Sequence, residues 1–218
     1  MPAKLRSAPF ETLVVFGDGA ARGMCATKPE RRWANLVAER IGAQQGSEMT
    51  LHNKGLSSNV ISPRSPGYDS SWRPSARDRY ERDVIALRPG VVIISFGLCD
   101  MRCAYEPRFF AEDLEHITAD VMARTGALTV LTTLSHMTRY GWYPPFDQGS
   151  RALAWAYNRV IAEVAGRTGA ILADVCGAQG GADWLVHDDG VHPNDAGHAV
   201  IGEAVFGAFA GALAGGRT

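Results

Sequence analysis

Short apolar runs alternate with longer segments of helical periodicity along most of the chain. The runs are mostly continuous and β-rich, a pattern typical of parallel strands that are covered on both faces. We expect five strands, at Thr12–Phe16, Met49–Asn53, Val91–Phe96, Ala127–Thr132 and Ala170–Asp174. We expect five helices, at Glu30–Ile41, Ser75–Leu87, Arg108–Arg124, Ser150–Gly166 and Asn194–Leu213.

The alternation of strand and helix predicts a class of fold. Five repeats of it indicate an α/β fold, a three-layer α/β/α sandwich around a parallel sheet. Five strands favour the flavodoxin-like strand order over the six-stranded Rossmann order. The chain contains no internal repeat, and its 218 residues fit a single domain over 1–218.

Two irregular stretches, Leu56–Pro74 and Tyr140–Gly149, interrupt the regular pattern. Loops of this length in a compact domain are usually functional or mobile. In an open parallel sheet, ligands bind beyond the carboxyl ends of the strands, so these loops are candidate walls of a site. Their aromatic residues either roof a ligand pocket or pack as ordinary loop residues: Tyr68, Trp72, Trp142, Tyr143 and Phe146.

Composition narrows the function classes. Hydrophobic residues make up 46% and charged residues 21%, which excludes a disordered or fibrous chain. A net charge of -1 offers no basic field for nucleic acid. No apolar run approaches the roughly 20 residues that span a bilayer, and the residues before Phe16 lack the features of a signal peptide. We expect a cytoplasmic protein with a small-molecule substrate or ligand, and neither a nucleic-acid nor a membrane partner.

The four cysteines, Cys25, Cys99, Cys103 and Cys176, are too few and too scattered for a disulfide framework. Cys99 and Cys103 lie four residues apart, but no matching Cys/His pair follows them. We therefore expect free thiols, no metal and no cofactor. The sequence leaves the oligomeric state open.

Four short blocks lie at strand ends or at the start of the last helix. They are Gly17-Asp18-Gly19, Asn53-Lys54-Gly55, Gly97-Leu98-Cys99-Asp100 and Asp189-Gly190-Val191-His192. Their order and placement resemble those of the SGNH/GDSL hydrolases, and the resemblance extends from Gly17 to His198. It implies the SGNH hydrolase fold, an esterase-like activity, and a site built from these blocks.

Two side chains that define that family are replaced here. The position of the nucleophilic serine holds Gly19, and the position of the oxyanion asparagine holds Cys99. Glycine has no Oγ and cannot form an acyl-enzyme, and a thiol is a weak donor to an oxyanion. Cys99 is either a substitute nucleophile or, as we favour, a small buried thiol.

The rest of the family's machinery is present by resemblance. His192 can act as general base or acid near neutral pH, and Asp189 can orient its ring, with Asp188 as the second-ranked partner. The backbone N–H groups of Gly19 and Gly55 are expected to point into the crevice as oxyanion donors. A degenerate catalytic triad with an Asp189–His192 dyad is the expected site.

Three hypotheses for function follow. In the first, the dyad acts on an ester-, acyl- or carbonyl-containing small molecule, by water-mediated hydrolysis or as the acid/base of a lyase, isomerase or cyclase step. In the second, the protein is a non-catalytic pseudoenzyme that binds a small ligand or a partner. In the third, it is a serine esterase whose nucleophile was replaced by design with Gly19.

Several residues near the blocks carry weaker signals. Ser57 and Ser58 can offer a hydroxyl near the site, although we favour loop-capping hydroxyls. Cys25 can approach the crevice, although we favour core packing, and His198 is interpreted as a surface or packing residue. His136 follows the fourth strand and can contact a ligand. Four arginines near strand ends can bind a carboxylate or phosphate, although for any one of them we favour a solvated surface: Arg22, Arg64, Arg73 and Arg102.

Overall fold

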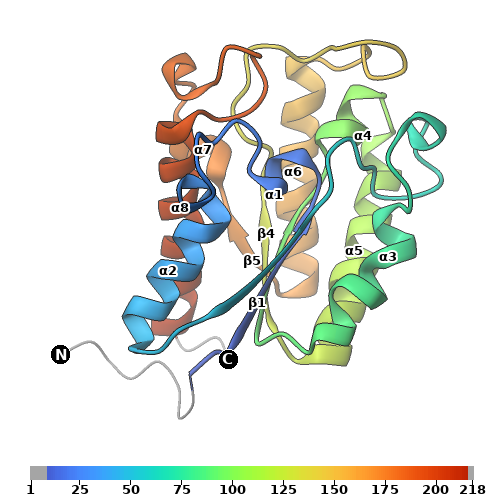
Figure 1. The fold of residues 1–218 in the computed structure, drawn as a ribbon. Coiled ribbons are helices and arrows are strands. Elements are labelled where there is room, and N and C mark those ends of the chain that lie inside the picture. Colours follow the sequence, from blue (N-terminus) through green and yellow to red (C-terminus); the bar gives the residue numbers. More distant parts are fainter. Residues whose placement is uncertain (1–8, 216–218) are drawn as a thin grey trace.

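Five parallel strands form one sheet with helices on both faces in the computed structural model, which describes residues 9–215 (Figure 1). The order of the strands is β2-β1-β3-β4-β5, and every neighbouring pair is parallel. The α/β/α sandwich and the flavodoxin-like order predicted from the sequence are confirmed. The strands are β1 Thr12–Gly17, β2 Thr50–Gly55, β3 Val91–Ser95, β4 Leu128–Thr132 and β5 Ile171–Ala173.

Helices cover the sheet in two groups, one on each face, and each group packs against the strand side chains that point to that face. Val14 and Phe16 of β1 belong to one core, and Leu13 and Val15 belong to the other, because successive side chains point to opposite faces of a strand. The first core is closed by α3 Ala76–Asp83, α5 Pro107–Thr125 and α6 Arg151–Thr168, and the second by α2 Trp33–Gln45 and α8 Asp195–Ala214.

Three short helices follow strands directly and were not expected from the sequence. They are α1 Gly19–Arg22 after β1, α4 Leu98–Arg102 after β3, and α7 Val175–Gln179 after β5. Helices of four or five residues are too short to show an apolar period. Single 3₁₀ turns lie at Pro29–Arg31, Tyr68–Ser70, Ile85–Leu87 and Asp183–Leu185.

Most expected boundaries lie within two residues of the observed ones. The helix expected at Glu30–Ile41 differs more, because α2 spans Trp33–Gln45 after a separate 3₁₀ turn. The second strand runs to Gly55 rather than Asn53, because its backbone pairs with β1 up to Gly17. The expected helix Ser75–Leu87 ends at Asp83, where Val84 leaves the helical region with φ -123°, and continues as a separate 3₁₀ turn.

Helix α8 is the one helix within residues 9–215 that is long and apolar enough to cross a membrane, by length and composition alone. This corrects the expectation that no apolar segment reaches that length. Its buried residues, among them Ile201, Val205 and Phe209, pack in the second core. A core helix of this kind passes the same test. The judgment that the chain lacks a signal peptide rests partly on residues 1–8, which lie outside the described residues.

Candidate functional site

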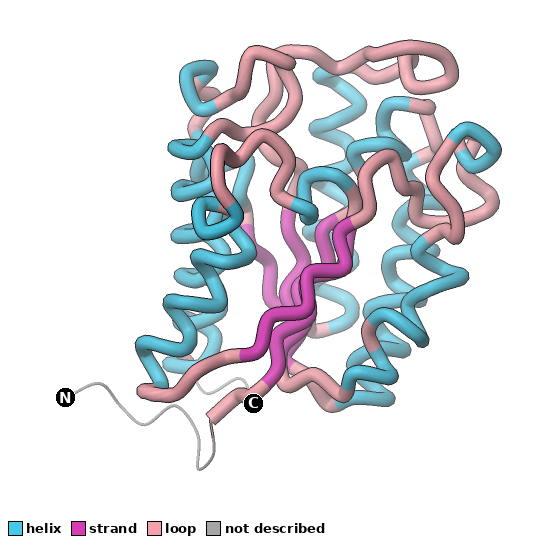
Figure 2. The backbone as a smooth tube through the Cα atoms, viewed as in Figure 1, coloured by secondary structure: helices cyan, strands magenta, loops and turns pink. Residues whose placement is uncertain are grey.

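The carboxyl ends of the strands meet at one edge of the sheet, under the loops drawn at the top of Figure 2. Helices α1 and α4 begin at this edge, each directly after a central strand. The side chain of Asp18 joins them. Its Oδ1 accepts a hydrogen bond from the Ala20 N–H at 3.0 Å, and its Oδ2 accepts one from the Leu98 N–H at 3.1 Å.

Asp18 is fully buried, and burial raises the pKa of its carboxyl to about 6 in spite of these hydrogen bonds. The carboxyl caps α1 and holds the first turn of α4 beside it. In this way the Asp18 carboxyl holds the first and third sequence blocks, which are 80 residues apart in the chain, side by side at this edge of the sheet.

The fourth block forms the dyad expected from the sequence. His192 Nδ1 lies 2.7 Å from Asp189 Oδ2, and the backbone N–H groups of Val191 and His192 donate to Asp189 Oδ1. Partial burial alone would raise the pKa of Asp189, but the hydrogen bonds from His192 and these backbone groups lower it to about 2. Asp189 is therefore an anion at neutral pH, and Asp188 is exposed and is not the partner of His192.

Gly19 lies directly in front of the histidine ring. A Cβ on Gly19 would lie 3.4 Å from His192 Nε2, with Met24 Cγ at 3.7 Å and Ser57 Cα at 3.8 Å. All three are ordinary van der Waals distances. The structure therefore brings together Gly19 and His192 in the relation that a nucleophile and its base require, with no side chain at the nucleophile's position.

Gly55 does not take the role expected of it. Its N–H donates to Asn53 Oδ1 at 2.9 Å and so does not point into the crevice. A Cβ on Gly55 would lie 2.2 Å from the Arg22 backbone nitrogen. Glycine is thus needed there because α1 packs directly against the end of β2. The expectation of an oxyanion donor at Gly55 is corrected on this geometry.

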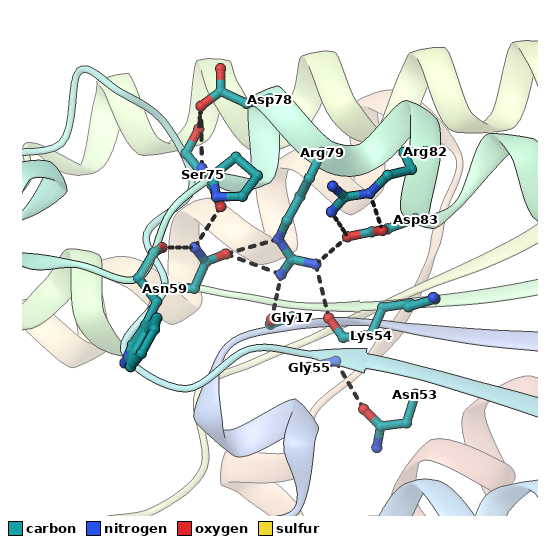
Figure 3. Close-up of polar contacts among 12 residues, drawn as sticks. Gly17, Asn53, Lys54, Gly55, Asn59, Ser75, Asp78, Arg79, Arg82 and Asp83 are labelled. Carbon is teal, nitrogen blue, oxygen red and sulfur yellow. Dashed lines mark hydrogen bonds and ion pairs between the residues drawn. The ribbon is translucent and has the colours of Figure 1, made fainter.

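A buried arginine that the sequence analysis did not single out holds the same strand ends (Figure 3). Arg79 of α3 donates to the carbonyls of Gly17 and Lys54 at 2.9 and 3.0 Å and to Asn59 Oδ1 at 3.0 and 3.1 Å. It also pairs with Asp83 at 3.0 Å. Asn59 in turn donates to the carbonyls of Trp72 and Pro74, so Arg79 fixes the loop after β2 to the sheet.

A cavity of about 280 Å³ opens in front of Gly19. Its walls come from α1 and the turn after it, the loop after β2, α4, the Tyr140–Gly149 loop, and His192 of the dyad. The lining residues are Gly19, Met24, Ser57, Ser58, Leu98, Cys99, Arg102, Trp142, Tyr143, Phe146 and His192.

Both irregular stretches therefore contribute to the site. Trp142, Tyr143 and Phe146 line the cavity, whereas Trp72 is 66% exposed and Tyr68 packs against the first core. The roof expected from five aromatic residues is formed by three of them.

Ser57 and Ser58 lie in the wall rather than at a remote turn. Ser57 Oγ accepts a hydrogen bond from Arg22 at 3.3 Å and lies 3.5 Å from Met24 Sδ. Ser58 has φ 52°, in the left-handed region that is uncommon for a residue other than glycine. Backbone of this kind is frequent in binding sites, so the loop conformation belongs to the site.

The thiol of Cys99 faces the same cavity. Burial raises its pKa well above the ordinary value, and the nearby carboxylates Asp18 and Asp100 raise it further. Cys99 is therefore a neutral thiol at physiological pH, and a neutral thiol is a poor nucleophile. The interpretation of Cys99 as a small buried thiol fits this environment better than that of a substitute nucleophile.

Cys25 contacts the dyad, whereas core packing was the favoured interpretation from the sequence. Its Sγ donates to Asp189 Oδ2 at 3.4 Å, the same oxygen that binds His192. Burial, together with Asp189, raises the pKa of this thiol to about 11. Cys25, His187 and Asp189 also bring three potential metal-ligating atoms within 4.8 Å of one another. Asp189 Oδ2 is shared between the Cys25 thiol and the His192 ring in this arrangement.

Other candidates lie elsewhere. His136 bonds to Asp183 at 2.8 Å and lines a different cavity, beside α6 and α7. His198 is fully buried, and its Nε2 lies 2.9 Å from the Met24 carbonyl oxygen. Arg64 and Arg73 form surface ion pairs with acidic residues. Arg102 is the exception among the four arginines, because it is buried and lines the cavity.

Comparison with known proteins places the chain in a family. Residues 15–200 match the family model of the GDSL-like lipase/acylhydrolases. No curated protein sequence matches the chain.

Solved structures share the fold. "Crystal Structure of TesA" aligns with a TM-score of 0.71 at 22% identity over 91% of this chain and 98% of that chain. A lipase/acylhydrolase from Enterococcus faecalis aligns with a TM-score of 0.72 at 20% identity, over 92% of this chain and 96% of that chain. Axe2, an acetylxylan esterase from Geobacillus stearothermophilus, aligns with a TM-score of 0.68 at 21% identity, over 94% of this chain and 95% of that chain. With a family match across most of its length and the dyad in place, this chain belongs to the GDSL-like lipase/acylhydrolase family.

Proposed function

We propose that this protein hydrolyses an ester or acyl bond of a small molecule without a nucleophilic serine, using His192 to activate water. The observation that carries the proposal is the relation of His192 to Gly19. His192 Nδ1 is held by Asp189 at 2.7 Å, and its Nε2 faces the position that a side chain on residue 19 would take, 3.4 Å away.

The groups present can move the protons of such a reaction. In the described part of the chain, His192 Nε2 has no hydrogen-bond partner, so it is free to accept a proton from a water that attacks the carbonyl carbon. The C–O bond to the leaving alcohol then breaks as Nε2 returns the proton to the alcohol oxygen. Asp189 stabilises the imidazolium formed in between, without accepting its proton.

The negative charge that develops on the carbonyl oxygen needs donors. The Gly19 N–H stands in the first turn of α1 and bonds to no acceptor among residues 9–215. It is the backbone donor that we assign to the oxyanion. Because the Gly55 N–H is used by Asn53 and Cys99 is a weak donor, we expect turnover to be slow.

The competing function is binding without turnover. The loss of both the serine and the asparagine favours it, since two independent parts of the family's machinery are replaced. A serine esterase whose nucleophile was replaced by design makes a third, distinguishable prediction: restoring one residue, Gly19→Ser, recovers activity, at a moderate rate because Cys99 still leaves a weak oxyanion hole.

The test is an assay with short-chain aryl esters on four proteins: the chain itself, His192→Ala, Gly19→Ser and Ser57→Ala. We expect slow turnover by the chain, its loss in His192→Ala, and its retention in Ser57→Ala, which excludes Ser57 as a relocated nucleophile. Gly19→Ser should be faster by at least about 10²-fold, which is less than the roughly 10⁶-fold contribution of a nucleophilic serine in a complete site, because the oxyanion donors here are weak. The distances around Gly19 leave room for that side chain.

The outcomes separate the three functions. Turnover that persists in His192→Ala contradicts the proposal. Silence of the chain with strong activity of Gly19→Ser indicates a hydrolase whose nucleophile was removed. Silence of both proteins favours the binding function.

A further inference from the structure

Arg102 is the one guanidinium that lines the cavity in front of Gly19. Its side chain extends from the last residue of α4, and the residue is only 7% exposed. Its Nη2 donates to the Arg139 carbonyl at 2.9 Å, whereas Nε is buried and has no hydrogen-bond partner. Arginine carries five N–H donors, and within residues 9–215 this bond is the one protein hydrogen bond that they make.

No carboxylate among the described residues forms an ion pair with this guanidinium, although Asp189 and Asp18 act on its charge from a longer distance. Within residues 9–215, no Asp or Glu oxygen lies within 4.0 Å of an Arg102 nitrogen, and none of the residues that line the cavity is acidic. The buried Arg79 makes the contrast clear, because its donors are taken by two carbonyls, Asn59 and Asp83. A buried, unpaired guanidinium is costly, and such groups usually have a partner.

An aromatic ring covers part of the guanidinium but does not supply an anion. The Arg102 Cζ lies 5.6 Å from the centroid of the Trp142 ring, and the Arg139 Cζ lies 4.6 Å from the same ring. Cation–π contacts offset part of the desolvation and leave the N–H donors free. Arg139 itself does not line the cavity, so within residues 9–215 Arg102 is the one arginine that does.

We propose that the cavity binds a ligand that carries a carboxylate, and that Arg102 is the counter-ion of that carboxylate beside the reacting centre. A single guanidinium matches a monoanion in charge, and its planar donors match a carboxylate in geometry. A phosphate dianion would be left with an uncompensated charge. Arg102 thereby sets the substrate class as an acidic ester or acyl compound.

The proposal rests on the proposed function for the nature of the reacting group, but the carboxylate site is tested without turnover. Isothermal titration calorimetry on His192→Ala measures binding of monomethyl succinate, which is a monoanion, and of dimethyl succinate, which is neutral. We expect monomethyl succinate to bind at least about 10-fold more tightly, the effect of a hydrogen-bonded charge pair. Added salt should reduce the difference.

Two arginine variants identify the group responsible. Arg102→Gln, made in the same background, should abolish the preference for monomethyl succinate. Arg139→Gln is the matched control, because it removes a cation from the same Trp142 ring but none from the cavity, and it should retain the preference. Arg102→Lys keeps the charge without the planar donors, so this variant should keep part of the preference for monomethyl succinate.

Equal affinity for the two succinate esters, or no detectable binding of either, overturns the proposal, and neither result needs an arginine variant. A preference that survives in Arg102→Gln also overturns it. Failure of the proposed function would appear separately, as silence in the aryl ester assay with the carboxylate preference intact.

Discussion

The Asp189 carboxylate is bonded by a histidine ring, a thiol and two backbone N–H groups. The local turn that carries Asp189 and His192 needs only three residues of separation, which is why their spacing was visible in the sequence. The thiol of Cys25 comes from 164 residues away and was not visible. Asp189 and His192 are thus paired by a local turn, whereas Cys25 is brought to Asp189 by the fold.

The lowered pKa of Asp189 makes a prediction about stability. Because the folded pKa of about 2 lies below the ordinary value of 3.8, the contribution is complete above about pH 4 and is lost as the pH falls from 4 to 2. Asp189→Asn should therefore lower the free energy of unfolding at pH 7 by about 1–2 kcal/mol, with no difference near pH 2. Urea unfolding at both pH values measures this.

Asp188→Asn is the control, since its side chain is exposed and is not bonded to His192. An equal loss of stability in the two variants would show that the effect does not come from the dyad.

At the scale of elements, α3 is joined to the ends of β1 and β2 by the side chain of Arg79. Arg79 and Arg82 both pair with Asp83, but their surroundings differ. The side chain of Arg79 is 2% exposed and bonds to two strand-end carbonyls, whereas that of Arg82 is 68% exposed. The helix, the strand ends and the loop through Asn59 therefore depend on one guanidinium.

Replacing the two arginines tests this difference. Arg79→Met should lower the free energy of unfolding by about 3–5 kcal/mol, because it leaves buried carbonyls and Asp83 without their partner. Arg82→Met should cost far less than Arg79→Met, because exposed ion pairs contribute little to stability. Chemical denaturation measures both, and a similar cost for the two variants would contradict the role of Arg79 as the connection between α3 and the sheet.

At the scale of the whole molecule, two buried carboxyls make stability depend on pH. Burial raises the pKa of Asp18 to about 6 and that of Asp100 to about 8, although both accept backbone hydrogen bonds. Both carboxyls connect distant segments, since Asp100 accepts from the Ile61 N–H in the loop after β2. The site is thus assembled around acids that prefer the neutral form.

The pH dependence of stability that comes from Asp18 and Asp100 is opposite in sign to the one that comes from Asp189. Because the folded pKa values lie above the unfolded ones, the stabilisation is complete below about pH 4 and is lost as the pH rises through 6 and 8. We expect the free energy of unfolding to fall between pH 4 and pH 8. Asp100→Asn, which keeps an oxygen acceptor but no ionisable group, should make that slope shallower. Denaturant titrations across this range measure the slope, and an unchanged slope in the variant would rule out Asp100 as its source.

The site residues that lie in short sequence blocks could be predicted, whereas roles that depend on contacts between distant segments could not. Gly19, Cys99 and the dyad were found because each lies in a short block at a strand end, and parallel strands bring such blocks to one edge. Gly55 was assigned wrongly, because the packing of α1 against β2 and the bond to Asn53 are contacts between segments. Arg102 was expected on a solvated surface, since no local pattern distinguishes a buried arginine from an exposed one.

The sequence by itself predicted the layers, because apolar periodicity is a local property, and the number of strands favoured the observed strand order. The Asp189–His192 pair was predicted from the resemblance of four short blocks to the SGNH/GDSL hydrolases. Only the tertiary structure decided which groups face the cavity. Ser57, Arg102 and Trp142 come from three loops or helices far apart in the chain, and their orientation is set by packing that no single segment encodes. The chemistry left to the protein, a dyad without a serine and one unpaired guanidinium, follows from that packing.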